Sequence, residues 1–240
     1  MEIPKGTIKE HSIKSNELGE DILLLIYLPA NFSPLFKYSL LIAQDGRDYF
    51  QLGKIGRLAD EYLFNREIEN LIIVGIPYKN VGDRRRKYHP DGDQHQQYIR
   101  FLAHELVPYL DQEFPTYQMG STRALIGDSL AATVSLMIAL QYPHSFGKVL
   151  LQSPYINEKV LDMVNSFTET ELLEIYHIVG NLETEVQTTN GKTSDFLSPN
   201  RRLSTIFTDK SFTYFYDEFD GDHTWTYWQP DLKRALKRMF

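Results

Sequence analysis

The chain has 240 residues, of which 42% are hydrophobic, and we expect them to form one domain, residues 1–240, around one sizeable core. A formal charge of −7 argues against nucleic acid or an anionic membrane as the main partner, because both select basic patches. No cysteine is present, which excludes a disulfide framework, a thiolate nucleophile and a cysteine metal site.

The N-terminal segment lacks the apolar stretch of a secretory signal, and no apolar run reaches the ~18 residues of a membrane span. We therefore expect a cytoplasmic protein. Residues 7–15 alternate between polar and apolar side chains and indicate an antiparallel edge strand.

The remaining elements alternate between strands and helices. Strand-length apolar runs occupy residues 22–28, 38–43, 71–76, 124–126, 149–151, 175–179 and 212–219. Helical spacing is found in residues 55–64, 98–114, 130–142, 160–173 and 232–240. This order predicts an α/β fold with a mostly parallel central sheet flanked by helices on both faces.

Two polar segments are expected to be loops. The basic run 84–87 is short, and residues 183–199 are polar with Asn190-Gly191 as a turn. No insertion is long enough for a separate lid domain, so we expect an open pocket built from the loops at the strand ends.

Residues 124–132, ALIGDSLAA, place Ser129 between a short strand and a helix. A strand followed by Gly-x-Ser-x-small and a helix is typical of a nucleophile elbow, where small residues such as Gly127 and Ala131 allow the helix and strand to approach. The alternative is that Ser129 or Asp128 only caps the helix.

A nucleophilic serine needs a base, and in the α/β-hydrolase order the base comes last. Three histidines follow Ser129. His144 follows a helix end, where a solvated histidine is common, and His177 lies inside a strand, where packing is expected. His223 lies in the loop between the last strand and the last helix, where the base is needed.

The acid is expected just beyond the strand at 175–179, where Glu183 supplies a carboxylate and Glu185 follows. Asp220 and Asp222 are reserve candidates for orienting His223. The letters GDSL also name another hydrolase class with an Asp-x-x-His motif, but that class carries its serine after the first strand, and about three strands precede Ser129 here.

Beyond these residues, the chain resembles the putative esterase family of α/β-hydrolases, which includes enterochelin esterase, esterase D and feruloyl esterases. The resemblance covers nearly the whole chain, in the segments SNELGEDILLLIYLPANF, YSLLIAQDGRDYF, LIIVGIPYKNVGDRRRKYHP, FLAHELVPYLDQEFPTY, RALIGDSLAA, FGKVLLQSP and DGDHTWTYWQPDLKRAL.

The resemblance implies an α/β-hydrolase fold with Ser129 as nucleophile, His223 as base and Glu183 aligned with the acid. It also implies an oxyanion hole made by the backbone amides of Leu130 and Arg47. The Leu130 amide additionally stands at a helix N-terminus, which favours developing negative charge. No cofactor and no metal are expected.

We therefore expect a serine hydrolase that cleaves a small-molecule carboxylic ester through an acyl-enzyme. A catalytically inactive binding protein of the same fold and an acyltransferase using the same residues are the alternatives, and a homodimer is compatible with the sequence. Five aromatic residues lie close in sequence to the candidate site residues, and they either line a pocket for the acyl or aryl group or belong to the core: Tyr49, Phe50, Tyr155, Trp225 and Trp228. For Trp228 we expect the core. Arg47, Arg84 and Arg85 either meet a carboxylate or catechol-type oxygen of the substrate or face solvent, as exposed arginines more often do.

Overall fold

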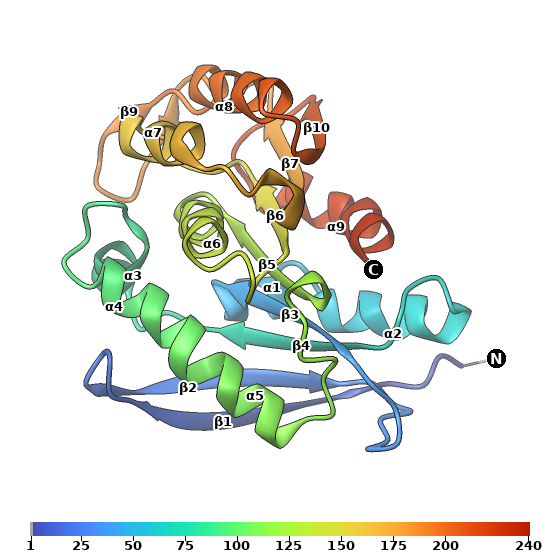
Figure 1. Ribbon diagram of the computed structural model, residues 1–240. Helices are drawn as coiled ribbons and strands as arrows, with labels where there is room; N and C mark the ends of the chain where they lie inside the picture. Colours follow the sequence, from blue (N-terminus) through green and yellow to red (C-terminus); the bar gives the residue numbers. More distant parts are fainter. Residues whose placement is uncertain (1) are drawn as a thin grey trace.

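The computed structural model describes residues 2–240, in which an eight-stranded sheet has the order β1-β2-β4-β3-β5-β6-β7-β10 (Figure 1). The strands β1 and β2 are antiparallel, β2 and β4 are antiparallel, and all other neighbours are parallel. Their bounds are β1 Thr7–Ser15, β2 Glu20–Leu28, β3 Ser39–Gln44, β4 Leu71–Ile76, β5 Arg123–Asp128, β6 Lys148–Gln152, β7 Glu174–Gly180 and β10 Thr213–Phe219. The predicted α/β fold is confirmed, and so is the antiparallel edge strand at 7–15.

The central strands are buried throughout and mostly apolar because helices cover both of their faces. Every residue of β3, β4 and β5 is buried. Alternate side chains enter two separate hydrophobic clusters: Leu40 and Ile42 belong to one, whereas Leu41 and Ala43 belong to the other.

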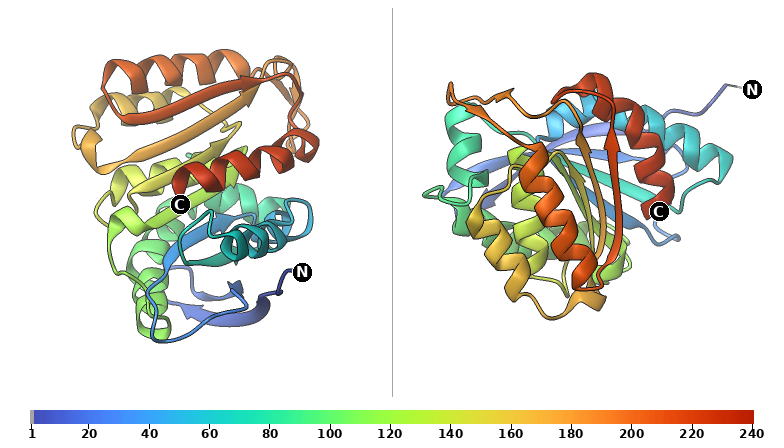
Figure 2. Two further views of the ribbon diagram at one scale, coloured as in Figure 1. Left: turned by 90° about the vertical axis from the view of Figure 1, so that its right-hand side faces the viewer. Right: turned by 90° about the horizontal axis from the view of Figure 1, so that it is seen from above.

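The helices form a layer on each face of this sheet (Figure 2). One layer contains α3 Val81–Tyr88, α4 His95–Arg100, α5 Val107–Glu113, α6 Leu130–Gln141, α7 Glu158–Ser166 and α8 Leu197–Asp209, with a π-helical turn Phe101–Leu106 joining α4 to α5. The opposite layer contains α1 Gly46–Gln51, α2 Ile55–Asn65 and α9 Trp225–Met239. None of the helices in the described chain, residues 2–240, combines the length and apolarity needed to cross a bilayer.

Several expected boundaries were wrong. The basic run 84–87 lies in α3, where Arg84 and Lys87 are buried, because both cations find carboxylate partners. The helix expected at 160–173 stops at Ser166 and is followed by a separate 3-10 turn, Thr170–Leu172. The last helix begins at Trp225 and not at residue 232, because its buried face already includes Trp228, and Pro230 lies inside it.

The polar segment 183–199 is more ordered than a loop. It contains the two-stranded hairpin β8 Val186–Gln187 and β9 Thr193–Ser194, and it ends inside α8. Gly191 has φ +77°, which agrees with the turn predicted at Asn190-Gly191.

His177 is fully buried, as its position inside a strand predicted, and it contacts Tyr214 Oη at 2.8 Å and Asn200 Oδ1 at 2.7 Å. Burial lowers the pKa of His177 to about 4, and burial also lowers the pKa of His95 to about 4. Both imidazoles are therefore neutral in the folded protein at pH 7.

These two histidines predict acid sensitivity. Because the unfolded chain binds their protons near the ordinary pKa of 6.5, their contribution to stability is complete above pH 6.5 and is lost as the pH falls towards 4. We expect the free energy of unfolding in urea to fall by about 2 kcal/mol for each histidine between pH 7 and pH 5. A His177→Gln variant should show a shallower decline, whereas the exposed His144→Gln variant should not. An unchanged unfolding free energy across this range would contradict the prediction.

Candidate active site

Ser129 stands on the sharp turn between β5 and α6. Its φ of +54° and ψ of −123° lie outside the regions that side-chain-bearing residues usually adopt. A Cβ on Gly127 would lie 2.2 Å from the backbone carbon of Ala131, so only glycine permits this close approach. Ser129 occupies the N-cap position without making a side-chain capping hydrogen bond, so helix capping does not explain the serine.

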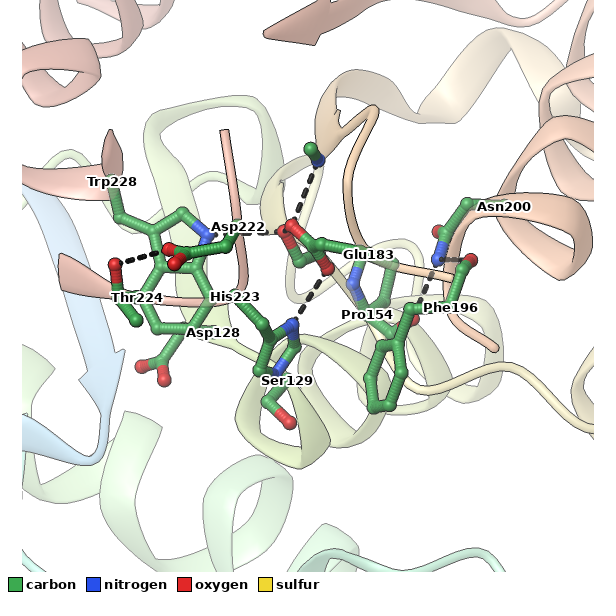
Figure 3. A network of polar contacts seen from close by, with 12 residues as sticks. Asp128, Ser129, Pro154, Glu183, Phe196, Asn200, Asp222, His223, Thr224 and Trp228 are labelled. Carbon is green, nitrogen blue, oxygen red and sulfur yellow. Dashed lines mark hydrogen bonds and ion pairs between the residues drawn. The ribbon is translucent and has the colours of Figure 1, made fainter. Parts of the chain in front are cut away.

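His223 and Glu183 are joined directly. The imidazole Nδ1 donates to Glu183 Oε2 at 2.6 Å, and the glutamate side chain is 0% exposed (Figure 3). The other candidates for this contact do not make it: Glu185 and Asp220 are exposed, and Asp222 Oδ1 accepts a hydrogen bond from Thr224. The tertiary structure thus brings His223 to Glu183 and not to the carboxylates beside it in sequence.

The side chain of Ser129 lies on the other side of the His223 ring from Glu183 in Figure 3. Ser129 and His223 line the same two cavities. No hydrogen bond joins their side chains among those recorded for residues 2–240. Such contacts are often long in structures without substrate, and they tighten when substrate binds.

Glu183 is fixed by donors that the sequence analysis did not identify. Its Oε1 accepts from Ser153 Oγ at 2.6 Å and from the Gly180 N–H at 2.8 Å, and Trp228 Nε1 donates to Ser153 Oγ at 3.0 Å. Ser153 lies just after β6 with φ +48°, and Trp228 is only 3% exposed. Trp228 is therefore core, as expected, and it also belongs to a hydrogen-bonded series that runs from Trp228 through Ser153 to Glu183.

We expect Ser153 to position Glu183. The Ser153→Ala variant leaves the Trp228 indole N–H and one Glu183 oxygen without this partner. If the chain hydrolyses esters as the sequence predicts, kcat should fall by about tenfold with little change in KM, and stability should fall by about 1–3 kcal/mol. Trp228→Phe should produce the same pattern more weakly. Initial rates measured on folded protein separate the loss of kcat from the loss of stability. An unchanged kcat would contradict a positioning role for Ser153.

A buried ion pair joins α3 to the turns that carry the site. Arg84 donates to both oxygens of Asp45, with Nη2 to Oδ2 at 2.5 Å, and the same Nη2 donates to the Asp128 carbonyl at 3.3 Å. Arg84 was one of three arginines considered as contacts for a substrate oxygen, but its guanidinium is occupied by Asp45. A single buried arginine in an arginine-rich run has no local signal that distinguishes it from its neighbours.

Asp128, the residue before Ser129, is a second buried carboxyl group at the elbow. Burial raises its pKa well above the ordinary value, and the negative charge of Asp45 adds to this effect. Its Oδ1 has no hydrogen-bond partner within residues 2–240. The carboxyl group therefore keeps its proton to a higher pH than an exposed aspartate does.

The two amides predicted for an oxyanion hole begin helices at the same edge of the sheet. Leu130 is the first residue of α6 after β5, and Arg47 is the second residue of α1 after β3, the strand that pairs with β5. First-turn N–H groups have no acceptor within their own helix. The Arg47 side chain is exposed and lines a separate cavity with Tyr78 and Lys79, so only its backbone is relevant to this prediction.

Two adjoining cavities contain Ser129 and His223. The larger, about 220 Å³, is bounded by Tyr155, by part of α3 and by the β8–β9 hairpin, and the smaller, about 200 Å³, is bounded by Asp45, Asp48 and Trp228, among others. Tyr49 is fully buried and donates from its hydroxyl to Gln152, and Trp225 packs edge-on against it. Within residues 2–240, no group of three or more histidine, aspartate or glutamate side chains could hold a metal ion.

The family of the chain follows from comparison with known proteins. Residues 15–239 match the family described as Putative esterase, and the chain belongs to this family. It is similar to "Uncharacterized protein YjcH" of Bacillus subtilis (strain 168), with 53% identity over 234 residues that cover 98% of both chains.

Solved structures share the fold at low identity. A ferulic acid esterase superposes with a TM-score of 0.79 at 17% identity, covering 98% of this chain and 99% of that one. Enterobactin esterase from Shigella flexneri superposes with a TM-score of 0.84 at 18% identity, covering 98% of this chain. The present chain spans 59% of that esterase chain, so this similarity describes the shared α/β-hydrolase part.

Proposed function

We propose that the protein is a serine hydrolase that cleaves small-molecule carboxylic esters through an acyl-enzyme. The observation that carries the proposal is the arrangement around one cavity: Ser129 on a turn with φ +54°, and His223 beside it with its Nδ1 held by the buried Glu183. Membership of the esterase family supports the same reaction class.

In the proposed reaction, each group has a separate task. His223 Nε2 accepts the Ser129 hydroxyl proton as Oγ attacks the ester carbonyl, and the resulting oxyanion is stabilised by the Leu130 and Arg47 amides. Nε2 then gives the proton to the departing alcohol. In the second half of the reaction, a water molecule loses a proton to Nε2 and attacks the acyl-enzyme. The carboxylic acid then leaves as Nε2 returns a proton to Ser129.

Glu183 keeps its negative charge throughout the proposed cycle. Its hydrogen bond holds the proton of His223 on Nδ1, so that Nε2 is free to act as the base. The carboxylate also stabilises the imidazolium that forms when Nε2 takes the serine proton. Because Glu183 is buried and accepts hydrogen bonds from Ser153 and Gly180, its orientation stays constant through both halves of the reaction.

Covalent labelling tests this function directly. A fluorophosphonate probe should label the folded protein at Ser129, with the adduct located by peptide mass spectrometry, and short-chain nitrophenyl esters should be hydrolysed. Folded protein that neither reacts with the probe nor turns over esters would favour a binding protein of the same fold. Ester products that contain an added alcohol in place of free acid would identify an acyltransferase.

A further inference from the structure

The larger cavity beside Ser129 has an unusual charge for a chain with a formal charge of −7. Its lining includes Arg84, Arg85, His89 and Lys192, and it includes no aspartate or glutamate. The positive side chains come from two separate segments, α3 and the β8–β9 hairpin, and both segments line the cavity that contains Ser129 and His223.

Two of these charges are not neutralised by the protein. Arg84 is already bound by Asp45, whereas the side chains of the half-buried Arg85 and the exposed Lys192 make no ion pair or hydrogen bond with any residue in the range 2–240. His89 adds little charge at neutral pH, because burial lowers its pKa and the nearby Arg85 lowers it further. The available positive charge is therefore that of Arg85 and Lys192.

The rest of the cavity wall is partly aromatic. The ring centroids of Phe196 and His223 lie 4.3 Å apart, and Tyr155 packs against both Phe196 and His89. Lys192 is carried on a turn whose backbone is fixed, because its carbonyl accepts from both the Thr188 N–H at 2.9 Å and the Thr188 hydroxyl at 2.7 Å. An occupant that fits this wall has an apolar body near Ser129 and a negative charge near the two cations.

We propose that Arg85 and Lys192 form an anion subsite that selects esters carrying a carboxylate at the end of an apolar acyl or alcohol group. This inference rests on the proposed role of Ser129 in ester cleavage. A guanidinium and an ammonium that lack carboxylate partners can both donate charge-assisted hydrogen bonds to such a group. The subsite selects among substrates and takes no part in bond cleavage.

Matched ester pairs test the subsite on each side of the scissile bond. For the acyl side, kcat/KM is compared for para-nitrophenyl hydrogen glutarate and its neutral methyl ester. For the alcohol side, para-acetoxybenzoate is compared with methyl para-acetoxybenzoate. In at least one pair the wild type should favour the anionic member by about tenfold, as expected for one charge-assisted hydrogen bond, and added salt should reduce this preference.

The charge variants distinguish the subsite from the general field of the protein. The double variant Arg85→Gln, Lys192→Gln should lose the preference while turnover of the neutral esters stays near wild type. Arg86→Gln is the matched control, because Arg86 follows Arg85 on α3 but pairs with Asp93 at 3.0 Å and does not line the cavity. A wild type without preference in either pair, or a double variant that keeps it, overturns the proposal.

A protein that does not cleave esters at all would hydrolyse neither the anionic nor the neutral esters, so this result is distinguished from the absence of an anion subsite. The subsite is still tested in that case by calorimetry on the Ser129→Ala protein, with monomethyl glutarate and dimethyl glutarate as probes. Tighter binding of the monoanion that disappears when Arg85 and Lys192 are replaced by glutamine supports the anion subsite. Equal binding of the two probes, or no binding of either, overturns it.

Discussion

Ser129→Ala is expected to lower kcat/KM for para-nitrophenyl acetate by roughly 10⁴-fold or more, because the variant lacks the hydroxyl that is proposed to form the acyl-enzyme. The thermal unfolding temperature should stay close to that of the wild type. The Ser129 hydroxyl makes no hydrogen bond recorded for residues 2–240, and alanine meets the same backbone strain at φ +54° that serine meets. Initial rates and a thermal melt on the same preparation measure both quantities.

Ser135→Ala is a suitable control for this variant. Ser135 lies on the same helix, is fully buried, and donates its hydroxyl to the Ala131 carbonyl at 2.8 Å, away from the cavities that hold Ser129. Its loss should leave kcat/KM near the wild-type value. Turnover retained by Ser129→Ala would refute the proposed nucleophile.

His223→Ala should cause a loss of comparable size, since the serine hydroxyl is a weak nucleophile at neutral pH without a base to take its proton. The second-order rate of labelling by the fluorophosphonate probe should fall in parallel with kcat/KM, because both reactions need the activated serine. His144→Ala is the control: the His144 side chain is 78% exposed and lies outside the cavities. Labelling at the wild-type rate in His223→Ala would exclude His223 as the base.

Glu183→Ala should lose less activity than either of these variants. The imidazole remains in place, but it no longer has the carboxylate that orients it and stabilises its charged form. Removing this buried acceptor also leaves Ser153 and the Gly180 N–H unpartnered, so stability should fall by about 1–3 kcal/mol. Activity equal to wild type would exclude Glu183 as the acid that orients His223.

The elements that the sequence predicted correctly share a local cause. Buried parallel strands are continuous apolar runs, so β4 at Leu71–Ile76 was predicted with its observed bounds. The elbow was predicted for a similar reason, because Gly127 and Ala131 lie within two residues of Ser129 and the steric demand of the turn is visible in that short stretch. Chain order then selected His223 among the histidines that follow Ser129.

Helix boundaries near polar residues were predicted less well, because tertiary partners overrode local composition. The run Arg84 to Lys87 reads as a solvated loop, yet Asp45 and Glu20 come from distant parts of the chain and allow both ends of that run to be buried within α3. The β8–β9 hairpin has strands of only two residues each, too short to produce a periodic pattern.

The sequence by itself determined the order of strands and helices, the strained position of Ser129 and the selection of His223 as the candidate base, because each follows from residues adjacent in the chain or from their order along it. Only the tertiary structure decided which carboxylate meets His223, what fixes that carboxylate and which cations remain free beside the serine. These depend on contacts such as Glu183 with Ser153 and Arg84 with Asp45, which join residues 30 and 39 positions apart. No local sequence pattern encodes contacts between residues so far apart in the chain. These contacts are set by the order of the strands in the sheet and by which turns meet at its edge.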